Sequence, residues 1–193
     1  EELGTPVDLV GLCQGGWMAM LFAARFPDKV RRLVLAGAPI DVRAAESELM
    51  RTVDDLPLDA FENLVRLGQG RVLGRYALEL WGRRSAATEP EQVLQVPLPD
   101  DKEEEHMLRR RFAQWYASTV DLPGTYYLEA VQRLFRDNQI AEGRFVALGR
   151  MVGLHSVRAP LYLLAAEDDE VVAREQLFAA AGLVGTPKPQ VET

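Results

Sequence analysis

A single cysteine lies inside a glycine-rich pentapeptide that is suited to nucleophilic chemistry. The segment Gly11-Leu12-Cys13-Gln14-Gly15 fits the pattern G-x-nucleophile-x-G, with cysteine where serine is usual. A short apolar run precedes it from Val7 to Gly11, and an alanine-rich apolar stretch follows it from Trp17 to Phe26. The order predicts a strand, a tight turn and a helix, with the Cys13 thiol presented at the turn for attack on an acyl carbon.

Such a turn is the nucleophile elbow of the α/β-hydrolase fold, and it explains the small residues around Cys13. The nucleophile takes a strained backbone conformation, so only small residues fit two positions to either side, and we assign Gly11 and Gly15 as the elbow glycines. We expect Gly16 to let the helix sit close to the strand. The N–H groups and positive dipole end of that helix favour a thiolate, and the Gln14 N–H is expected to donate to the oxyanion.

Two other interpretations of the segment around Cys13 are a buried structural cysteine and a dinucleotide-binding loop. A lone cysteine in a protein of a reducing compartment is usually a small buried hydrophobic residue, and Cys13 would then have no chemistry. A dinucleotide-binding loop would need G-x-G-x-x-G, but Cys13 occupies the position of the middle glycine. The strand before Cys13 and the helix after it favour the catalytic interpretation.

An acidic turn late in the chain supplies the second member of a triad. In this fold the order is nucleophile, acid and histidine, with the acid on a loop after a late strand. The apolar run from Pro160 to Ala166 predicts that strand, and Asp168 and Asp169 follow it. We prefer Asp169 as the acid and keep Asp168 as the alternative, although either carboxylate could instead cap the next helix.

The third member of a triad has no candidate in the expected place. Imidazole is the base suited to this chemistry near neutral pH, but no histidine follows Asp169. His106 falls in a charged helix and His155 falls before the late strand, so both violate the chain order and are interpreted as surface or structural residues. We therefore expect the chain to be a fragment that lacks N-terminal strands and the C-terminal loop with the histidine, and to be inactive by itself.

These elements predict a partial α/β-hydrolase fold with a large helical insertion. Residues 1–41 form the first part of the core, with the elbow and a second parallel strand at Arg32 to Ala36. Residues 42–158 show no convincing strand and are predicted to be a helical cap, because ordinary crossover loops have only ~2 to 6 residues. Residues 159–193 return to the core with the acid-bearing strand, its loop and a helix.

Composition excludes several classes of protein. The formal charge of −7 and the isoelectric point near 5.0 argue against a nucleic-acid partner, which would require clustered Lys and Arg. One cysteine cannot form an internal disulfide, which suits the cytoplasm. The longest apolar stretches fall well short of the ~20 residues that span a bilayer, so no membrane segment is expected.

Several further motifs accompany the elbow and define a resemblance. They are Val10 to Trp17, Ala38-Pro39-Ile40-Asp41 with Arg43, Val120-Asp121-Leu122-Pro123 with Tyr126-Tyr127-Leu128, and Glu167-Asp168-Asp169 with Gln176. Together they resemble the bacterial intracellular polyhydroxyalkanoate depolymerases and, more distantly, the polyhydroxyalkanoate synthases. The resemblance implies that Cys13 takes an acyl group as a thioester, that Asp169 is the acid, and that the substrate is a 3-hydroxyacyl ester or polyester.

The choice within this resemblance is between three functions. Glu170-Val171 stands where the synthases favour His-Ile, and the aspartate before the threonine of the cap motif is missing, so the sequence favours an ester hydrolase. The alternative is a synthase-type acyltransferase that uses 3-hydroxyacyl-CoA, and the third is a noncatalytic homologue associated with polyhydroxyalkanoate granules. We expect neither a metal ion nor a cofactor in any of them.

Overall fold

A computed structural model of the chain describes residues 4–74, 99–117, 120–167, 169 and 171–193. The chain divides into two compact units. The first unit comprises Glu1–Asp55 with Glu129–Thr193, and the second comprises Leu56–Leu128. Part of the predicted cap, 42–158, lies outside the described residues, and its bounds stay a prediction.

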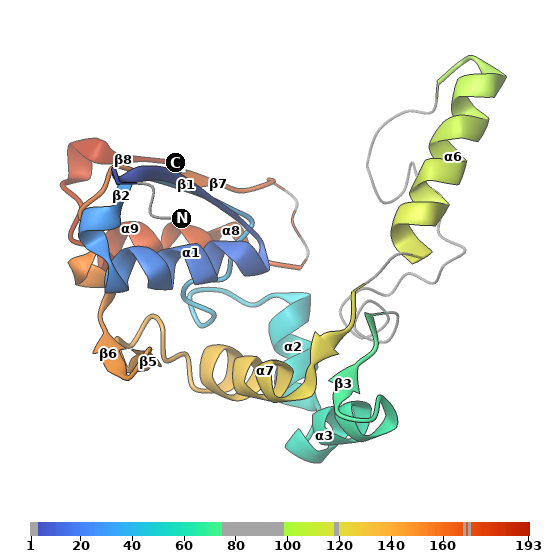
Figure 1. The fold of residues 1–193 in the computed structure, drawn as a ribbon, viewed down its shortest axis with the longest axis horizontal. Coiled ribbons are helices and arrows are strands. Elements are labelled where there is room, and N and C mark those ends of the chain that lie inside the picture. Colours follow the sequence, from blue (N-terminus) through green and yellow to red (C-terminus); the bar gives the residue numbers. More distant parts are fainter. Residues whose placement is uncertain (1–3, 75–98, 118–119, 168, 170) are drawn as a thin grey trace. The chain divides into compact units, whose positions relative to one another are not determined.

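The first unit is built on a four-stranded sheet of parallel strands (Figure 1). Its order is β1-β2-β7-β8, with bounds β1 (Val7–Leu12), β2 (Val30–Ala36), β7 (Leu161–Leu164) and β8 (Val191–Glu192). Leu12 pairs with Ala36, and Ala36 pairs with Leu164, so the carboxyl ends of three strands meet at one edge. The predicted fold class is confirmed, because a parallel sheet with flanking helices and an elbow after its first strand is a partial α/β-hydrolase fold.

Three helices lie on the same side of this sheet in Figure 1. They are α1 (Gln14–Arg25), α8 (Arg174–Phe178) and α9 (Ala180–Leu183). Right-handed crossovers explain the arrangement, because α1 joins β1 to β2 and the other two helices join β7 to β8, and both connections progress across the sheet in the same direction. A parallel strand needs apolar cover, and Met20 of α1 and Leu177 of α8 are both fully buried.

The remaining elements are short helices and two strand pairs. In the first unit they are η1 (Pro27–Lys29), α2 (Glu48–Asp55), η2 (Ala130–Arg136, a π-helix), β5 (Phe145–Ala147), β6 (Arg150–Val152), η3 (Leu154–Ser156) and η4 (Lys188–Gln190). In the second they are α3 (Leu58–Leu67), β3 (Arg71–Val72), α6 (Lys102–Ala117), β4 (Leu122–Pro123) and most of α7 (Gly124–Glu129). The antiparallel pairs β3–β4 and β5–β6 were not expected, because two or three residues are too few to show strand alternation.

A helix that crosses a bilayer must be both long and apolar. Within the residues that the structure describes, no helix meets both requirements.

Truncation of Leu35 tests whether this residue belongs to the core under the sheet. This residue of β2 is fully buried, and Leu35→Ala should lower the free energy of unfolding by about 2–5 kcal/mol through lost burial and an unfilled cavity. Met151→Ala is the control, because Met151 in the same unit is 71% exposed and its truncation should change stability by less than about 0.5 kcal/mol. Urea unfolding measures the free energy of unfolding of the two variants. An equal decrease in both would contradict the assignment of Leu35 to the core.

Candidate active site

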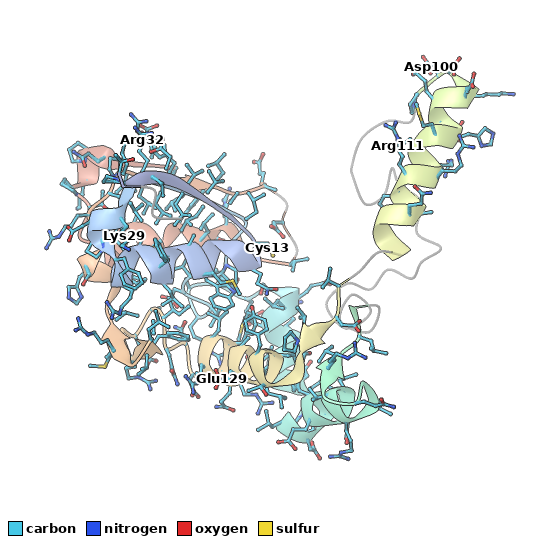
Figure 2. The ribbon with its side chains drawn as sticks, in the orientation of Figure 1. Cys13, Lys29, Arg32, Asp100, Arg111 and Glu129 are labelled. Carbon is cyan, nitrogen blue, oxygen red and sulfur yellow. The ribbon has the colours of Figure 1, made fainter. Side chains whose placement is uncertain are left out.

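Cys13 lies between β1 and α1, at the carboxyl edge of the sheet (Figure 2). Its backbone has φ 48° and ψ −118°, a left-handed conformation that non-glycine residues rarely adopt and that costs about 1–3 kcal/mol. The conformation is held by two main-chain hydrogen bonds: the Cys13 N–H donates to Ala36 O (2.8 Å), and Cys13 O accepts from the Gly16 N–H (2.9 Å). The side chain is exposed. A strained, exposed residue at this turn has the geometry that an elbow nucleophile needs.

Two of the neighbouring glycines are required by close approach, and one is not. A Cβ on Gly11 would lie 2.6 Å from both Gly15 O and Gly16 Cα, so the predicted constraint is confirmed there. A Cβ on Gly16 would lie 2.3 Å from the Cβ of Ala38, which confirms that Gly16 allows the close packing of α1. The steric reason predicted for Gly15 is wrong: its Cβ would meet no atom within 4 Å, because this position of α1 faces open space.

The surroundings of Cys13 act on its thiol in opposing directions. Although the residue as a whole is exposed, partial withdrawal of its sulfur from water is the largest effect and raises the pKa of Cys13, because a thiolate loses solvation there. The main-chain N–H of Gln14 hydrogen-bonds the thiol and lowers the pKa, and the negative charge of Asp169 raises it. The net result of these effects is a raised pKa for Cys13. The contact does place the N–H of Gln14, the predicted oxyanion donor, beside the reacting sulfur.

Asp169 follows β7 at the same edge of the sheet. Its Oδ1 accepts hydrogen bonds from the N–H groups of Val171 (2.9 Å) and Val172 (3.0 Å), so the carboxylate organises its own turn. Its Oδ2 lies 3.7 Å from the position that a Cβ on Gly37 would take, at the end of β2. The structure therefore brings Asp169 to the edge where Cys13 lies, close enough for its charge to act on the thiol. Asp168, the alternative acid, lies outside the described residues.

The two histidines of the chain, His106 and His155, belong to elements other than those that carry Cys13 and Asp169. His155 belongs to η3, which precedes β7 and so lies toward the amino end of that strand, whereas Cys13 follows the carboxyl end of β1. His106 belongs to α6 of the second unit. No histidine of the described part of the first unit is therefore at the edge that carries Cys13 and Asp169. Within the described residues, no three His, Cys, Asp or Glu side chains are grouped so that they could hold a metal ion.

The segment after β2, residues 37–47, is held by contacts that the sequence did not predict. We call it the β2 loop. Asn138, at φ 47°, accepts from the Val42 N–H through Oδ1 (3.2 Å) and donates through Nδ2 to Asp41 Oδ1 (2.8 Å). Arg43 pairs with Asp54 of α2 (2.8 Å). The Ala38-to-Arg43 motif of the resemblance thus anchors this loop.

The parallel sheet and the elbow together have the architecture of the α/β-hydrolase fold. A solved structure with this fold, the monoacylglycerol lipase of Paleococcus ferrophilus, matches 97% of this chain and 57% of its own with a TM-score of 0.53 and 16% identity. That likeness concerns the fold alone. A family model covers residues 2–180, and the chain belongs to that family, which is described as "Protein of unknown function (DUF3141)".

The chain is also similar in sequence to curated proteins that share one name. The chain is 27% identical over 182 residues to the "Poly(3-hydroxyalkanoate) polymerase subunit PhaC" of Allochromatium vinosum, covering 94% of this chain and 50% of the relative. It is 29% identical over 170 residues to the protein of the same name from Synechocystis, covering 86% of this chain and 45% of the relative. The chain thus spans about half the length of the curated relatives that it matches.

Replacement of the two elbow glycines and of Gly16 distinguishes their roles. Gly16→Ala should lower the free energy of unfolding by about 1–3 kcal/mol or more, because the new methyl group overlaps Ala38, and Gly11→Ala should do at least as much damage against backbone atoms. Gly15→Ala is the matched control and should raise stability by up to about 1 kcal/mol, as alanine does inside a helix. Urea unfolding checks the order; a Gly15 variant as unstable as the Gly16 variant would refute it.

The charge of Asp169 should be measurable at Cys13. Asp169→Asn keeps an Oδ1 acceptor for the turn but removes the negative charge, so the pKa of Cys13 should fall and iodoacetamide alkylation should become faster at lower pH. Glu167→Gln is the control, because it removes an exposed carboxylate from the same turn without a counterpart among the effects on Cys13. The pH profile of alkylation would contradict the placement of Asp169 if both variants moved it equally or neither did.

Proposed function

We propose that the protein containing this chain transfers 3-hydroxyacyl groups through Cys13, as a polyhydroxyalkanoate polymerase would. The observation that carries the proposal is the cysteine itself, held in a strained left-handed conformation at an elbow and exposed at the edge that also bears Asp169. The names of the relatives support the substrate class, because similarity to the PhaC subunits runs along 94% of the chain. This choice departs from the hydrolase that the sequence favoured and adopts its alternative.

The proposed reaction has two acyl-transfer steps. The thiolate of Cys13 attacks the carbonyl carbon of a 3-hydroxyacyl thioester, the oxyanion takes a hydrogen bond from the Gln14 N–H, and the leaving thiol departs with a proton. The terminal hydroxyl of a polyester chain then attacks the Cys13 thioester; its proton passes to a base, an ester bond forms, and Cys13 is released. The polyester and the acyl donor are the partners that this chemistry implies.

A base must take the proton in both steps. Without one, withdrawal from water and the nearby carboxylate keep the pKa of Cys13 raised, which is unfavourable for a nucleophile. A histidine oriented by Asp169 would act as this base and would offset the charge of the carboxylate. The described residues of the first unit place no histidine at this edge, so the base is part of the proposal and is assigned to no residue of the chain.

Ester hydrolysis is the second candidate, and one feature of the sequence favours it. Glu170-Val171 replaces the His-Ile that the synthases favour after the acid. In that case water rather than a chain hydroxyl attacks the Cys13 thioester, and the product is a free hydroxy acid. Both candidates share the acyl-enzyme and differ in the acyl donor, which is a CoA thioester or a polyester, and in the acceptor, which is a chain hydroxyl or water.

An assay of the whole protein separates the candidates. Hydroxybutyryl-CoA and a hydroxybutyrate oligomer are supplied, and CoA release, polymer growth and acid release are followed. CoA release with polymer growth is the expected result. Acid release from the oligomer without growth would overturn the synthase proposal in favour of the hydrolase, and absence of both would overturn catalysis and leave a noncatalytic granule-associated protein.

Replacement of the nucleophile tests the role of Cys13. Cys13→Ala should lower the turnover rate by about 10⁴-fold or more, because no other group forms the thioester. Stability should change little, since the thiol is exposed. Met151→Ala, which removes an exposed sulfur side chain from β6, should leave both unchanged. Substantial activity of a folded Cys13→Ala protein would show that Cys13 is no more than a structural thiol.

A further inference from the structure

Gln176 of α8 is a fully buried amide that reaches across to the β2 loop. Its Nε2 donates to Ala45 O (2.8 Å) and to Val42 O (3.0 Å). Its main-chain oxygen accepts from the N–H groups of Ile40 (3.2 Å) and Asp41 (2.9 Å). Nε2 also donates to Ser47 Oγ (3.4 Å), so one residue holds the β2 loop at five points, through both its side chain and its backbone.

The orientation of this amide is determined by its acceptors. Two carbonyl oxygens can be satisfied only by the NH₂ group, so Oε1 must point the other way, where it is buried with no hydrogen-bond partner among the described residues. A buried acceptor without a partner destabilises the folded state. An apolar side chain of similar volume would avoid that cost, so filling the core does not by itself account for an amide at this position.

The β2 loop, which Gln176 holds, lies next to Asp169 and to the first turn of α1, the helix that follows Cys13. At its start, Gly37 lies beside Asp169 Oδ2, and its N–H donates to Leu164 O at the end of β7 (3.0 Å). One residue later, Ala38 packs against Gly16 at the first turn of α1, directly after Cys13. A shift of the β2 loop would therefore move the carboxylate relative to the thiol.

We propose that Gln176 is a positioning residue, which holds the β2 loop and thereby sets the separation between the Asp169 carboxylate and the Cys13 thiol. The catalytic consequence of that separation rests on the proposed function, but the separation itself does not. Gln176 touches neither reacting group, so its effect must pass through the loop and Asp169. A Coulomb interaction varies inversely with distance, so a displaced carboxylate should be detectable at the sulfur.

The pH profile of Cys13 alkylation by iodoacetamide, measured on the whole protein, provides the test. Gln176→Met keeps the volume but removes both donors, and it should move the midpoint of the profile by about 0.3 pH unit or more. In a protein that already carries Asp169→Asn, the same substitution should move it by much less, because the charge that reports the displacement is gone. Gln176→Asn keeps an amide on a shorter side chain and should give an intermediate profile.

Matched controls distinguish a positioning role of Gln176 from a general loss of stability. Gln139→Met removes another amide donor of the same unit, which bonds Asp137 Oδ2 (3.0 Å), and should leave the profile unchanged. Urea unfolding establishes that each variant is folded; if Gln176→Met is not, Gln176→Asn supplies the comparison. An unchanged profile in a folded Gln176 variant overturns the proposal, as does an equal shift with and without the Asp169 charge or an equal shift for Gln139→Met.

The alkylation profile does not depend on turnover. If the acyltransfer assay fails while the coupling between Gln176 and Asp169 is found, the proposed function is wrong and the positioning role stands. If turnover is found without the coupling, the proposed function stands and the positioning role of Gln176 is wrong.

Discussion

The close approach of α1 to the ends of β1 and β2 is the constraint on which the rest of the site depends. Gly11 and Gly16 leave no room for a Cβ, the first against the backbone of α1 and the second against Ala38. Because the helix begins so close to the strand, the chain between them must turn at one residue, and Cys13 takes the left-handed conformation that results. Hydrogen bonds to Ala36 and Gly16 hold it there and offset the strain.

The same geometry has an electrostatic consequence. At the carboxyl edge of the sheet the thiol meets the first N–H of a helix, which favours a thiolate, and a carboxylate, which disfavours it. Loss of water outweighs the helix contribution, so the pKa of Cys13 is raised in the first unit as described. A base that removes the proton of this thiol would offset both unfavourable effects, and the proposed function includes such a base for that reason.

Local patterns predicted the elbow, and long-range contacts account for what was missed. The apolar run from Val7, the pentapeptide and the alanine-rich stretch are contiguous, so β1, the turn and α1 could be inferred from neighbouring residues. The role assigned to Gly15 was wrong because G-x-C-x-G does not say which glycine faces the strand. Gln176 entered only through the resemblance, because the partners of its amide, Val42 and Ala45, are more than a hundred positions away in the chain. Substrate choice was beyond the sequence, since an acyl-cysteine is common to hydrolase and synthase.

If Cys13 carries the acyl group, the acyl-enzyme can be trapped. The whole protein is mixed with hydroxybutyryl-CoA, quenched in acid within the first turnovers, digested and analysed by mass spectrometry. We expect the added mass of a hydroxybutyryl group on the peptide that contains Cys13, labile to hydroxylamine as a thioester is. An unmodified Cys13 peptide during active turnover, or an acyl group on a different residue, would contradict this role of Cys13.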